Sequence, residues 1–393
     1  MTSPVRADVV VIGAGLVGCA TAYELAKRGV DVLVLERAWI GAGSSTRGMG
    51  GIRQQFADEI DVRLVQESLP TWERFADEVG GEAHFAQRGY LFLAETEAGL
   101  AELESLVAPL RSFGADVRMV DRAEIAELVP GIRADDLLGG RFCAQDGYGD
   151  PSVALRGFAD GARRHGGRIL EQQGAIGIVA RDGRVAGVDT TETHVVAAQV
   201  LVACGAWSAD ILATCAVQVP IWPYRRQLAR AADFPQLARI PMTIEWESGL
   251  HFRAKEMDQL FAMPNLARDG SVEKAPTAPG PAAPMMPDPR ALAWTQERAA
   301  RRHPAFAGLR FAEAWACYYE MTPDDHPILG AVPEVEGLYL AAGFSGHGFM
   351  QSPATGRCMA ELLTEGRAQT VDIGPLGIER FRDGVSRFKA SVL

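Results

Sequence analysis

The chain has 393 residues, of which 48% are hydrophobic, and a formal net charge of -11. Its length and apolar content predict two domains with a large core, and its acidic balance disfavours nucleic acid and anionic membranes as partners. Six cysteines without a CxxC pair, no charged-then-apolar leader, and no apolar stretch near the roughly 20 residues that span a bilayer predict a soluble protein of the reducing cytoplasm.

The first predicted elements form a βαβ unit. A β-branched run at residues 8–12 leads into a glycine turn, helical spacing follows over residues 17–28, and a second apolar run covers residues 30–35. Two strands joined by a helix in this way are the unit from which dinucleotide-binding sheets are built.

The turn of this unit predicts a dinucleotide site. Gly13, Gly15 and Gly18 permit a tight turn, close approach of a pyrophosphate and close helix–strand packing, and the helix N-terminus attracts anions. Glu36 ends the second strand, where a carboxylate accepts ribose hydroxyls and repels the 2′-phosphate of NADP. An ordinary glycine turn is the alternative.

A run of small residues at positions 41–47, after Glu36 and Arg37, bears on which dinucleotide binds. Its glycines and hydroxyls could approach the pyrophosphate and ring system of an extended FAD, which a simple NAD enzyme does not need. A solvated Gly/Ser loop is the alternative.

The next elements open a second domain. Helical patterns are expected at residues 58–78 and 95–113, on either side of a strand at residues 89–94. A turn at residues 146–151 then precedes a helix that ends near His165.

The second half of the chain returns to the first domain. Two β-rich runs flank a hairpin at Asp182-Gly183, and a third run ends at residues 203–205. Residues 275–290 contain six prolines and predict a loop, a linker or a lid. A strand at residues 338–342, a glycine-rich turn and a helix at residues 353–363 close the pattern.

Several motifs in one order resemble the D-amino-acid-oxidase-like flavoproteins, in the branch of glycine oxidase, sarcosine oxidase and its β-subunit relatives. The resemblance covers nearly the whole chain. It rests on GAGLVGCATAYELAKRG with Glu36, GSSTRGMGGIRQQF (43–56), DGYGDP (146–151), LVACGAWS (201–208), the triplet Arg225-Arg226-Gln227, YYEMTPDDHPILG (318–330) and GFSGHGFMQSPATG (343–356).

The resemblance implies an α/β fold with an α+β second domain, in which a Rossmann-like FAD-binding domain is interleaved with a mixed-sheet substrate domain. It assigns residues 1–84, 145–218 and 318–393 to the FAD-binding domain, and residues 85–144 and 219–317 to the substrate domain. The cofactor contacts that we expect are Gly13, Gly15, Gly18, Glu36, Arg37, Gly43, Ser44, Ser45, Arg47, Gly205, Cys317, Gly343, Gly346, His347, Gly348, Phe349 and Met350.

Four residues are the candidates for catalytic roles. Positive charge and N–H groups near the flavin stabilise its reduced form, which favours His347 in the glycine-rich loop, although a structural loop histidine is the alternative. Arg53 is the better match to the family's active-site arginine than Arg47, and a salt bridge is the alternative for both. Tyr319 matches a pocket tyrosine of the family and could instead be a core tyrosine.

Arg225 and Arg226 are adjacent on an extended chain, so at most one is expected to face the substrate. Cys317 precedes Pro323 by six residues, the spacing at which similar sarcosine oxidases attach FAD covalently. A buried core cysteine is the alternative.

Two departures from the sarcosine oxidase pattern concern function. Met350 replaces a lysine that binds the substrate carboxylate, which favours a larger or less charged amine. The oxygen-activating lysine is replaced in Gly249-Leu250-His251, and Lys255 lies near the place of the family's histidine. Either His251, the fourth catalytic candidate, supplies the positive charge, or oxygen is not the preferred electron acceptor.

The predicted reaction is FAD-dependent oxidation of a secondary amine or N-methyl amino acid at the C–N bond to an imine, with hydride transfer to the flavin. The alternatives are a 2-hydroxy-acid or alcohol dehydrogenase on the same fold, and a flavin subunit that works only in a larger complex. The expected partners are the amine, and oxygen or an electron-acceptor protein. No metal site is expected, because Asp324-Asp325-His326 alone is better interpreted as a turn.

Overall fold

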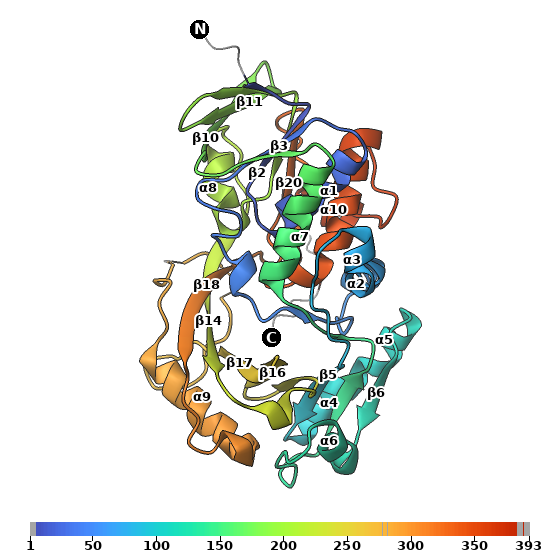
Figure 1. Cartoon of the computed structure of the whole chain (residues 1–393), viewed down its shortest axis with the longest axis vertical. Coiled ribbons are helices and arrows are strands. Elements are labelled where there is room, and N and C mark those ends of the chain that lie inside the picture. Colours follow the sequence, from blue (N-terminus) through green and yellow to red (C-terminus); the bar gives the residue numbers. More distant parts are fainter. Residues whose placement is uncertain (1–4, 277, 281, 383–387, 389–393) are drawn as a thin grey trace.

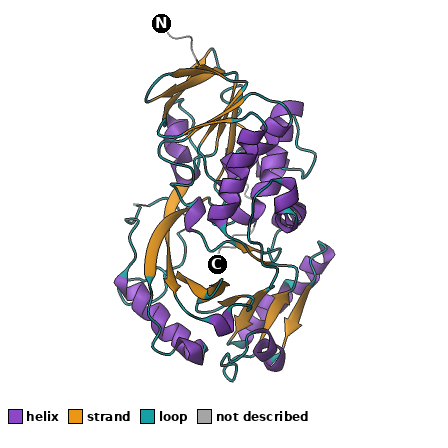
Figure 2. Ribbon diagram, in the orientation of Figure 1, coloured by secondary structure: helices purple, strands orange, loops and turns teal. Residues whose placement is uncertain are grey.

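A computed structural model describes residues 5–276, 278–280, 282–382 and 388 of the chain. Its strands form two large sheets in two parts of the molecule (Figure 1), and the helices pack on the outer faces of these sheets (Figure 2). The ends of the predicted FAD-binding domain, residues 1–4, 383–387 and 389–393, and residues 277 and 281 of the proline-rich segment lie outside the described residues.

The first large sheet has the order β19-β20-β13-β2-β3-β9. Its strands are β2 (Val9–Ile12), β3 (Val32–Leu35), β9 (Arg168–Leu170), β13 (Gln199–Val202), β19 (Ile328–Ala331) and β20 (Leu338–Ala342). All neighbours pair in parallel except β19 and β20. Strands β2 and β3 are unbroken Val/Leu/Ile runs because both faces of this sheet are covered.

Helices cover one face of this sheet and a smaller sheet covers the other (Figure 1). The helices are α1 (Leu16–Lys27), α2 (Glu59–Glu73), α7 (Pro151–Arg164) and α10 (Gly348–Glu365). The smaller sheet contains β1 (Val5–Arg6), β10 (Ala175–Arg181), β11 (Arg184–Thr190) and β12 (His194–Val196). Helices α1 and α10 cross at close range: a Cβ added to Gly356 would lie only 2.7 Å from the carbonyl carbon of Ala20, so only glycine fits at this position.

The second large sheet has the order β18-β14-β17-β16-β15-β5-β7-β6. Its strands are β5 (Tyr90–Ala94), β6 (Val117–Val120), β7 (Gly139–Cys143), β14 (Trp222–Ala231), β15 (Met242–Glu245), β16 (His251–Lys255), β17 (Asp258–Met263) and β18 (Glu313–Met321). The pair β15–β5 is parallel and the others are antiparallel, so this sheet is mixed. Helices α4 (Glu97–Ser105), α6 (Arg122–Leu128) and α9 (Pro289–Arg302) lie beside it (Figure 1).

The predicted fold class is confirmed, and three predicted helices differ in their bounds. The helix expected at 58–78 divides at Arg74 into α2 and α3 (Phe75–Glu78). The one expected at 95–113 divides at Leu106 into α4 and α5 (Val107–Ser112). Pro109 has no N–H for a helical hydrogen bond, and its ring would clash with the carbonyl one turn before it in a continuous helix.

The third difference affects the site. Helix α10 begins at Gly348, one and a half turns before the expected start at Pro353. Pro353 lacks the N–H that would bond the carbonyl of Phe349, and the Ser352 hydroxyl donates to that carbonyl instead, at 2.9 Å. The glycine-rich turn therefore passes directly into a helix N-terminus.

The two-domain division remains a prediction. Strands of the first large sheet come from all three segments assigned to the FAD-binding domain, but β18 crosses the predicted boundary between residues 317 and 318. Among the described helices, none is long and apolar enough to cross a membrane.

Candidate cofactor and substrate site

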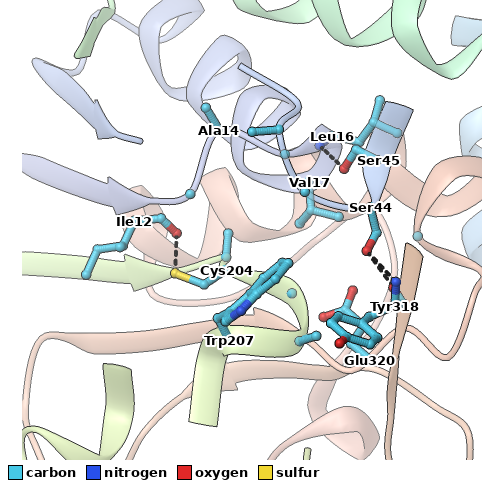
Figure 3. Close-up of a pocket in the computed structure, with 18 of the residues that line it drawn as sticks. Ile12, Ala14, Leu16, Val17, Ser44, Ser45, Cys204, Trp207, Tyr318 and Glu320 are labelled. Carbon is cyan, nitrogen blue, oxygen red and sulfur yellow. Dashed lines mark hydrogen bonds between the residues drawn. The ribbon is translucent and has the colours of Figure 1, made fainter. Parts of the chain in front are cut away.

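A cavity of about 410 Å³ runs from the carboxyl edge of the first large sheet to strand β18 of the second. Figure 3 shows the glycine turn on one side of it and Trp207, Tyr318 and Glu320 on the other. The predicted site residues that line it are Gly13, Gly15, Glu36, Arg37, Gly43, Ser44, Ser45, Gly205, Cys317, Tyr319, Gly346, Gly348 and Phe349.

The glycine turn leaves no room for side chains. Gly13 has a φ of 108°, and a Cβ there would lie 2.5 Å from the carbonyl oxygen of Ala203. A Cβ on Gly18 would lie 2.1 Å from the carbonyl oxygen of Gly13. Gly18 therefore does not line the cavity but holds α1 against the turn, as its predicted packing role requires.

Glu36 is fixed at the end of β3 by two backbone donors. Its carboxylate accepts hydrogen bonds from the N–H of Ala14, at 3.0 Å, and of Ala38, at 2.9 Å. The next residue, Arg37, holds its guanidinium 4.3 Å from the ring centroid of Trp207 across the cavity. Both side chains are thus oriented before any ligand binds.

The Gly/Ser segment is hydrogen-bonded to helix α1 on one side and to strand β18 on the other. The Ser45 hydroxyl accepts from the N–H of Leu16 at 3.1 Å, and the Ser44 hydroxyl donates to the carbonyl of Tyr318 at 2.6 Å (Figure 3). Arg47 turns away from the cavity and donates to the carbonyls of Ala42 and Gly43. Its role in this structure is to hold the segment in shape.

Strand β18 forms the far wall. A Cβ on Gly346, which has a φ of 97°, would lie 2.3 Å from the ring of Tyr319, so the glycine lets the ring pack on the loop. Cys317 is buried beside it, and burial raises the pKa of its thiol to about 12. The thiol is therefore neutral at pH 7 in the structure.

The glycine-rich turn places the N-terminus of α10 at the cavity, where Gly348 and Phe349 line it. His347 is buried and does not line the cavity, and burial together with Arg53 lowers its pKa well below the ordinary value. The positive charge at this point therefore comes from the N-terminus of the 18-residue helix α10 and not from a protonated His347. Gly343 lies behind the cavity with a φ of 84°.

Met350 also turns away from the cavity. It is buried in the core between sheet and helices, and its carbonyl accepts from the Trp72 indole at 3.1 Å. At this position the chain has neither the lysine of the sarcosine oxidases nor space for a ligand.

Arg53 is buried among aromatic rings. Its guanidinium carbon lies 4.1 Å from the ring centroid of Phe56 and 5.9 and 6.0 Å from those of Phe92 and Tyr90. One nitrogen donates to the carbonyl of Gln55 at 2.7 Å, and another lies 3.4 Å from Nε2 of His347. Among the described residues Arg53 forms no ion pair. The salt bridge considered as an alternative role for Arg53 is therefore not present among them.

A buried cluster of hydrogen bonds around Asp146 fixes the loop that carries Arg53. Asp146, of the DGYGDP motif, accepts from the N–H of Gln54 and the side chain of Gln55, both at 2.9 Å. Arg141 donates to the other end of the Gln55 amide at 2.9 Å. The geometry of Arg53 thus depends on residues about 90 positions away.

His251 is partly buried beside the same tyrosine, with Nε2 3.4 Å from the hydroxyl of Tyr90. Burial, followed by the charges of Arg53 and Arg226, lowers the pKa of His251 to about 3. The neutral form therefore prevails at pH 7, and His251 does not supply the positive charge considered from the sequence. Lys255 does not replace it, because its amine pairs with Asp150 at 3.1 Å.

Arg225 and Arg226 point in different directions, as predicted. Arg225 turns toward Asn265 and the carbonyl of Met286, whereas Arg226 lies 5.1 Å from the ring centroid of Tyr224 and 5.0 Å from that of Tyr319.

The lining residues that had no role assigned from the sequence include Cys204, Trp207, Tyr318 and Glu320. All four lie in motifs that the sequence singled out, LVACGAWS and YYEMTPDD. The position of Cys204 and Trp207 after β13 could have indicated them, because β13 is the parallel neighbour of β2 and ends at the same edge.

A buried charge cluster supports α10 from below. His326 Nε2 lies 2.8 Å from Asp61 and 3.4 Å from Asp58, while Asp61 accepts from Gln351 of α10 at 2.8 Å. The two carboxylates raise the pKa of His326 to about 10 against the effect of its burial. Asp324 and its partner Arg380 are the other charged groups that face it.

We expect His326→Gln to lower the free energy of unfolding by about 3–5 kcal/mol at pH 6, as the loss of one partner of a buried pair does. Because the pKa rises from 6.5 to about 10 on folding, the wild-type advantage is complete below pH 6.5 and disappears as the pH approaches 10. Urea unfolding at pH 6, 8 and 10 measures it.

The matched control is His194→Gln, because the His194–Asp189 pair is half-exposed and should contribute less than about 1 kcal/mol. A difference between wild type and His326→Gln that is independent of pH would contradict the expectation.

The chain is similar to known proteins over nearly its whole length, in sequence and in structure. The sequence profile of the family DAO, FAD dependent oxidoreductase, matches residues 8–362. The bovine (Bos taurus) FAD-dependent oxidoreductase domain-containing protein 1 is 30% identical over 97% of this chain and 86% of its own, and glycine oxidase of Geobacillus kaustophilus is 26% identical over 95% and 97%. The crystal structure of L-proline dehydrogenase from P. horikoshii is 31% identical, with a TM-score of 0.90 over 98% of this chain and all of that one.

Proposed function

Since the chain belongs to the FAD-dependent oxidoreductase family, with FAD as its cofactor, we propose that it oxidises the secondary amine of a free amino acid of the proline or N-methyl amino acid class. The C–N bond becomes an imine, and the bound cofactor supplies the hydride acceptor. The observation that carries the proposal is Arg53, a buried cation among aromatic rings without an acidic partner among the described residues.

The residues of the cavity fit FAD. Glu36 is held ready for ribose hydroxyls, and the N-termini of α1 and α10 both point positive ends at the cavity, one for the pyrophosphate and one for the flavin. Gly15 and Gly346 keep the walls open, since a Cβ on Gly15 would lie 3.0 Å from the Ser45 hydroxyl and one on Gly346 would meet Tyr319.

Arg53 would bind the substrate carboxylate. A guanidinium out of water without a counterion is costly, and a carboxylate ligand that accepts two hydrogen bonds offsets that cost. The rings of Phe56, Tyr90 and Phe92 exclude water around it and suit an apolar side chain or ring on the ligand. Since Met350 is directed into the core and carries no charge, we assign this task to Arg53.

The neutral histidine His251 suits an amine that must lose its proton before oxidation. Its pKa is low partly because Arg53 and Arg226 are positive. A substrate carboxylate on Arg53 would cancel one of these charges and raise the pKa of His251, so that its ring accepts a proton from the substrate ammonium more readily.

The electron acceptor that we propose is a molecule other than oxygen. The lysine that activates oxygen in similar oxidases is absent, and the neutral His251 provides no charge in its place. One structural relative with 31% identity is a dehydrogenase by name.

Anaerobic bleaching of the bound flavin at 450 nm tests the substrate class. We expect L-proline or an N-methyl amino acid to bleach the flavin, and glycine and lactate to leave it oxidised. Readmission of air should then restore the colour slowly, whereas an artificial acceptor such as a quinone restores it quickly. Bleaching by lactate alone would sink the proposal and favour the hydroxy-acid alternative, and rapid reoxidation in air would reject the choice of acceptor.

Covalent attachment through Cys317 is the second point to test. The thiol lines the cavity, but with a pKa of about 12 it has little thiolate at pH 7. We therefore expect acid precipitation to release all of the flavin from the wild type and from Cys317→Ala alike. Flavin that stays with the wild-type precipitate and leaves the Cys317→Ala precipitate would overturn this expectation.

One observation supports the alternative that the chain is a flavin subunit that works only in a larger complex. Sarcosine oxidase subunit beta of Rhizobium meliloti is 26% identical over 96% of this chain, and its name makes it part of a larger enzyme. Turnover of the purified chain alone with L-proline and an artificial acceptor would show that the proposed oxidation needs no second subunit.

A further inference from the structure

Glu320 is a cavity residue to which neither the sequence nor the proposed reaction gives a role. It lies on β18 between Tyr319 and Met321, and its carboxyl faces the cavity beside Tyr318 and Trp207 (Figure 3). Gly205, which follows β13, is its neighbour, since a Cβ there would lie at van der Waals distance, 3.6 Å, from Oε2 of Glu320.

The carboxyl has few partners for a charged group. Oε2 accepts from the N–H of Gly343 at 2.8 Å, and the N–H of Phe344 is a second backbone donor. Among the described residues Glu320 forms no ion pair. A carboxylate has about four acceptor sites, so this one depends on water in the open cavity for the rest of its stabilisation.

Filling the cavity removes that water. A bound dinucleotide adds a low-dielectric ring system and the two negative charges of its pyrophosphate. Both effects disfavour the negatively charged form of Glu320. A neutral carboxyl fits better, because it still accepts from Gly343 and its O–H can donate to an acceptor of the ligand.

We propose that Glu320 couples FAD binding to uptake of one proton, so that the carboxylate of the cofactor-free cavity becomes a neutral carboxyl in the holoprotein. The balance is one proton from solvent for each FAD bound, with no other bond made or broken. Glu320 is thus a residue that makes cofactor retention dependent on pH.

Burial already raises the pKa of Glu320 to about 7 in the structure, while the amides of Gly343 and Phe344 oppose that rise. Below pH 7 the carboxyl is therefore largely neutral and FAD binding needs no proton. Above pH 7 each further pH unit weakens FAD binding by up to tenfold, until the pH passes the still higher pKa of the FAD-bound state.

The other titratable groups that line the cavity come from three parts of the chain. They are Glu36 and Arg37 after β3, Cys204 and Asp210 near η2 (Gly205–Trp207), and Cys317, Tyr318 and Tyr319 on β18. Burial raises the pKa of Cys204 and Cys317 to about 12 and also raises that of Tyr319. These thiols and this phenol therefore stay neutral between pH 6 and 9.

Equilibrium dialysis of the full-length holoprotein against FAD at pH 6, 7, 8 and 9 tests the proposal. We expect the dissociation constant of the wild type to rise toward tenfold per pH unit above pH 7, and that of Glu320→Gln to stay within about twofold over the range. Calorimetric titration of the FAD-depleted full chain at pH 8, in two buffers of different ionisation enthalpy, should show close to one proton taken up by the wild type and none by the variant.

Glu313→Gln is the matched control, because Glu313 begins the same strand but is exposed and pairs with Arg230 outside the cavity. It should keep the wild-type pH dependence. A flat wild-type curve, or a Glu320→Gln curve with the wild-type slope, overturns the proposal. Weaker binding by Glu320→Gln at every pH with the slope retained would mean a structural role only, and unfolding midpoints of all three proteins identify a folding defect.

Discussion

Replacement of Arg53 by methionine is expected to lower kcat/KM for the amino acid substrate about 100-fold, mainly through KM. The lost interaction is a charge-assisted hydrogen-bond pair with the substrate carboxylate, which contributes about 3 kcal/mol in a buried site. The flavin should stay bound, because Arg53 does not line the cofactor cavity. Steady-state kinetics with an artificial electron acceptor measure the effect.

The stability of this variant separates binding from folding. Arg53 is a buried cation without an acidic partner among the described residues, so its replacement should leave the unfolding temperature unchanged or raise it. Arg225→Met is the control, since Arg225 turns to the other side of β14, and its kcat/KM should be that of the wild type. A wild-type KM in Arg53→Met would remove the main support of the proposed substrate class.

The second large effect is expected for Gly18→Ala, which should yield protein with less than about a tenth of the normal flavin. The added methyl group would lie 2.1 Å from the carbonyl oxygen of Gly13, closer than any Cβ contact, so either α1 or the dinucleotide turn must move. The ratio of flavin to protein absorbance after purification measures the loss, and addition of FAD to the variant tests whether the site still exists.

This variant changes no group that lines the cavity, which makes it a test of geometry alone. Gly280→Ala is the control, because a Cβ on Gly280 would meet nothing within 4 Å, and it should retain full flavin. A normal flavin content in Gly18→Ala would mean that the turn tolerates a displacement that the structure gives it no room to make.

The geometry of the glycine turn could be predicted from the sequence because its determinants are local, while its contact with adenosine remains a prediction. Gly13, Gly15, Gly18 and Glu36 lie within 24 positions of one another, and each owes its role to a turn, a helix N-terminus or a strand end. Strand, helix and glycine patterns express these features directly. The structure adds the donors that fix Glu36 and shows that Gly18 packs α1 on the turn instead of lining the cavity.

The region expected at the flavin was predicted less well because it is assembled from distant segments. Arg47, His347 and Met350 belong to motifs at the cavity, yet all three point away from it in the structure. The direction of a side chain in an irregular turn depends on what packs behind it, such as Trp72 behind Met350. The start of α10 was misjudged for a related reason, since Ser352 satisfies the carbonyl that Pro353 leaves free.

The sequence by itself determined the class of fold, the glycine turn and the motifs that contribute to the cavity, because these depend on short-range pattern and on the stereochemistry of glycine and proline. Only the tertiary structure decided the protonation states. Desolvation, followed by the charges of Arg53 and Arg226, lowers the pKa of His251 to about 3, and desolvation raises the pKa of Glu320 to about 7. Burial and the distance between charges set a pKa, and both are decided when segments far apart in the chain pack together.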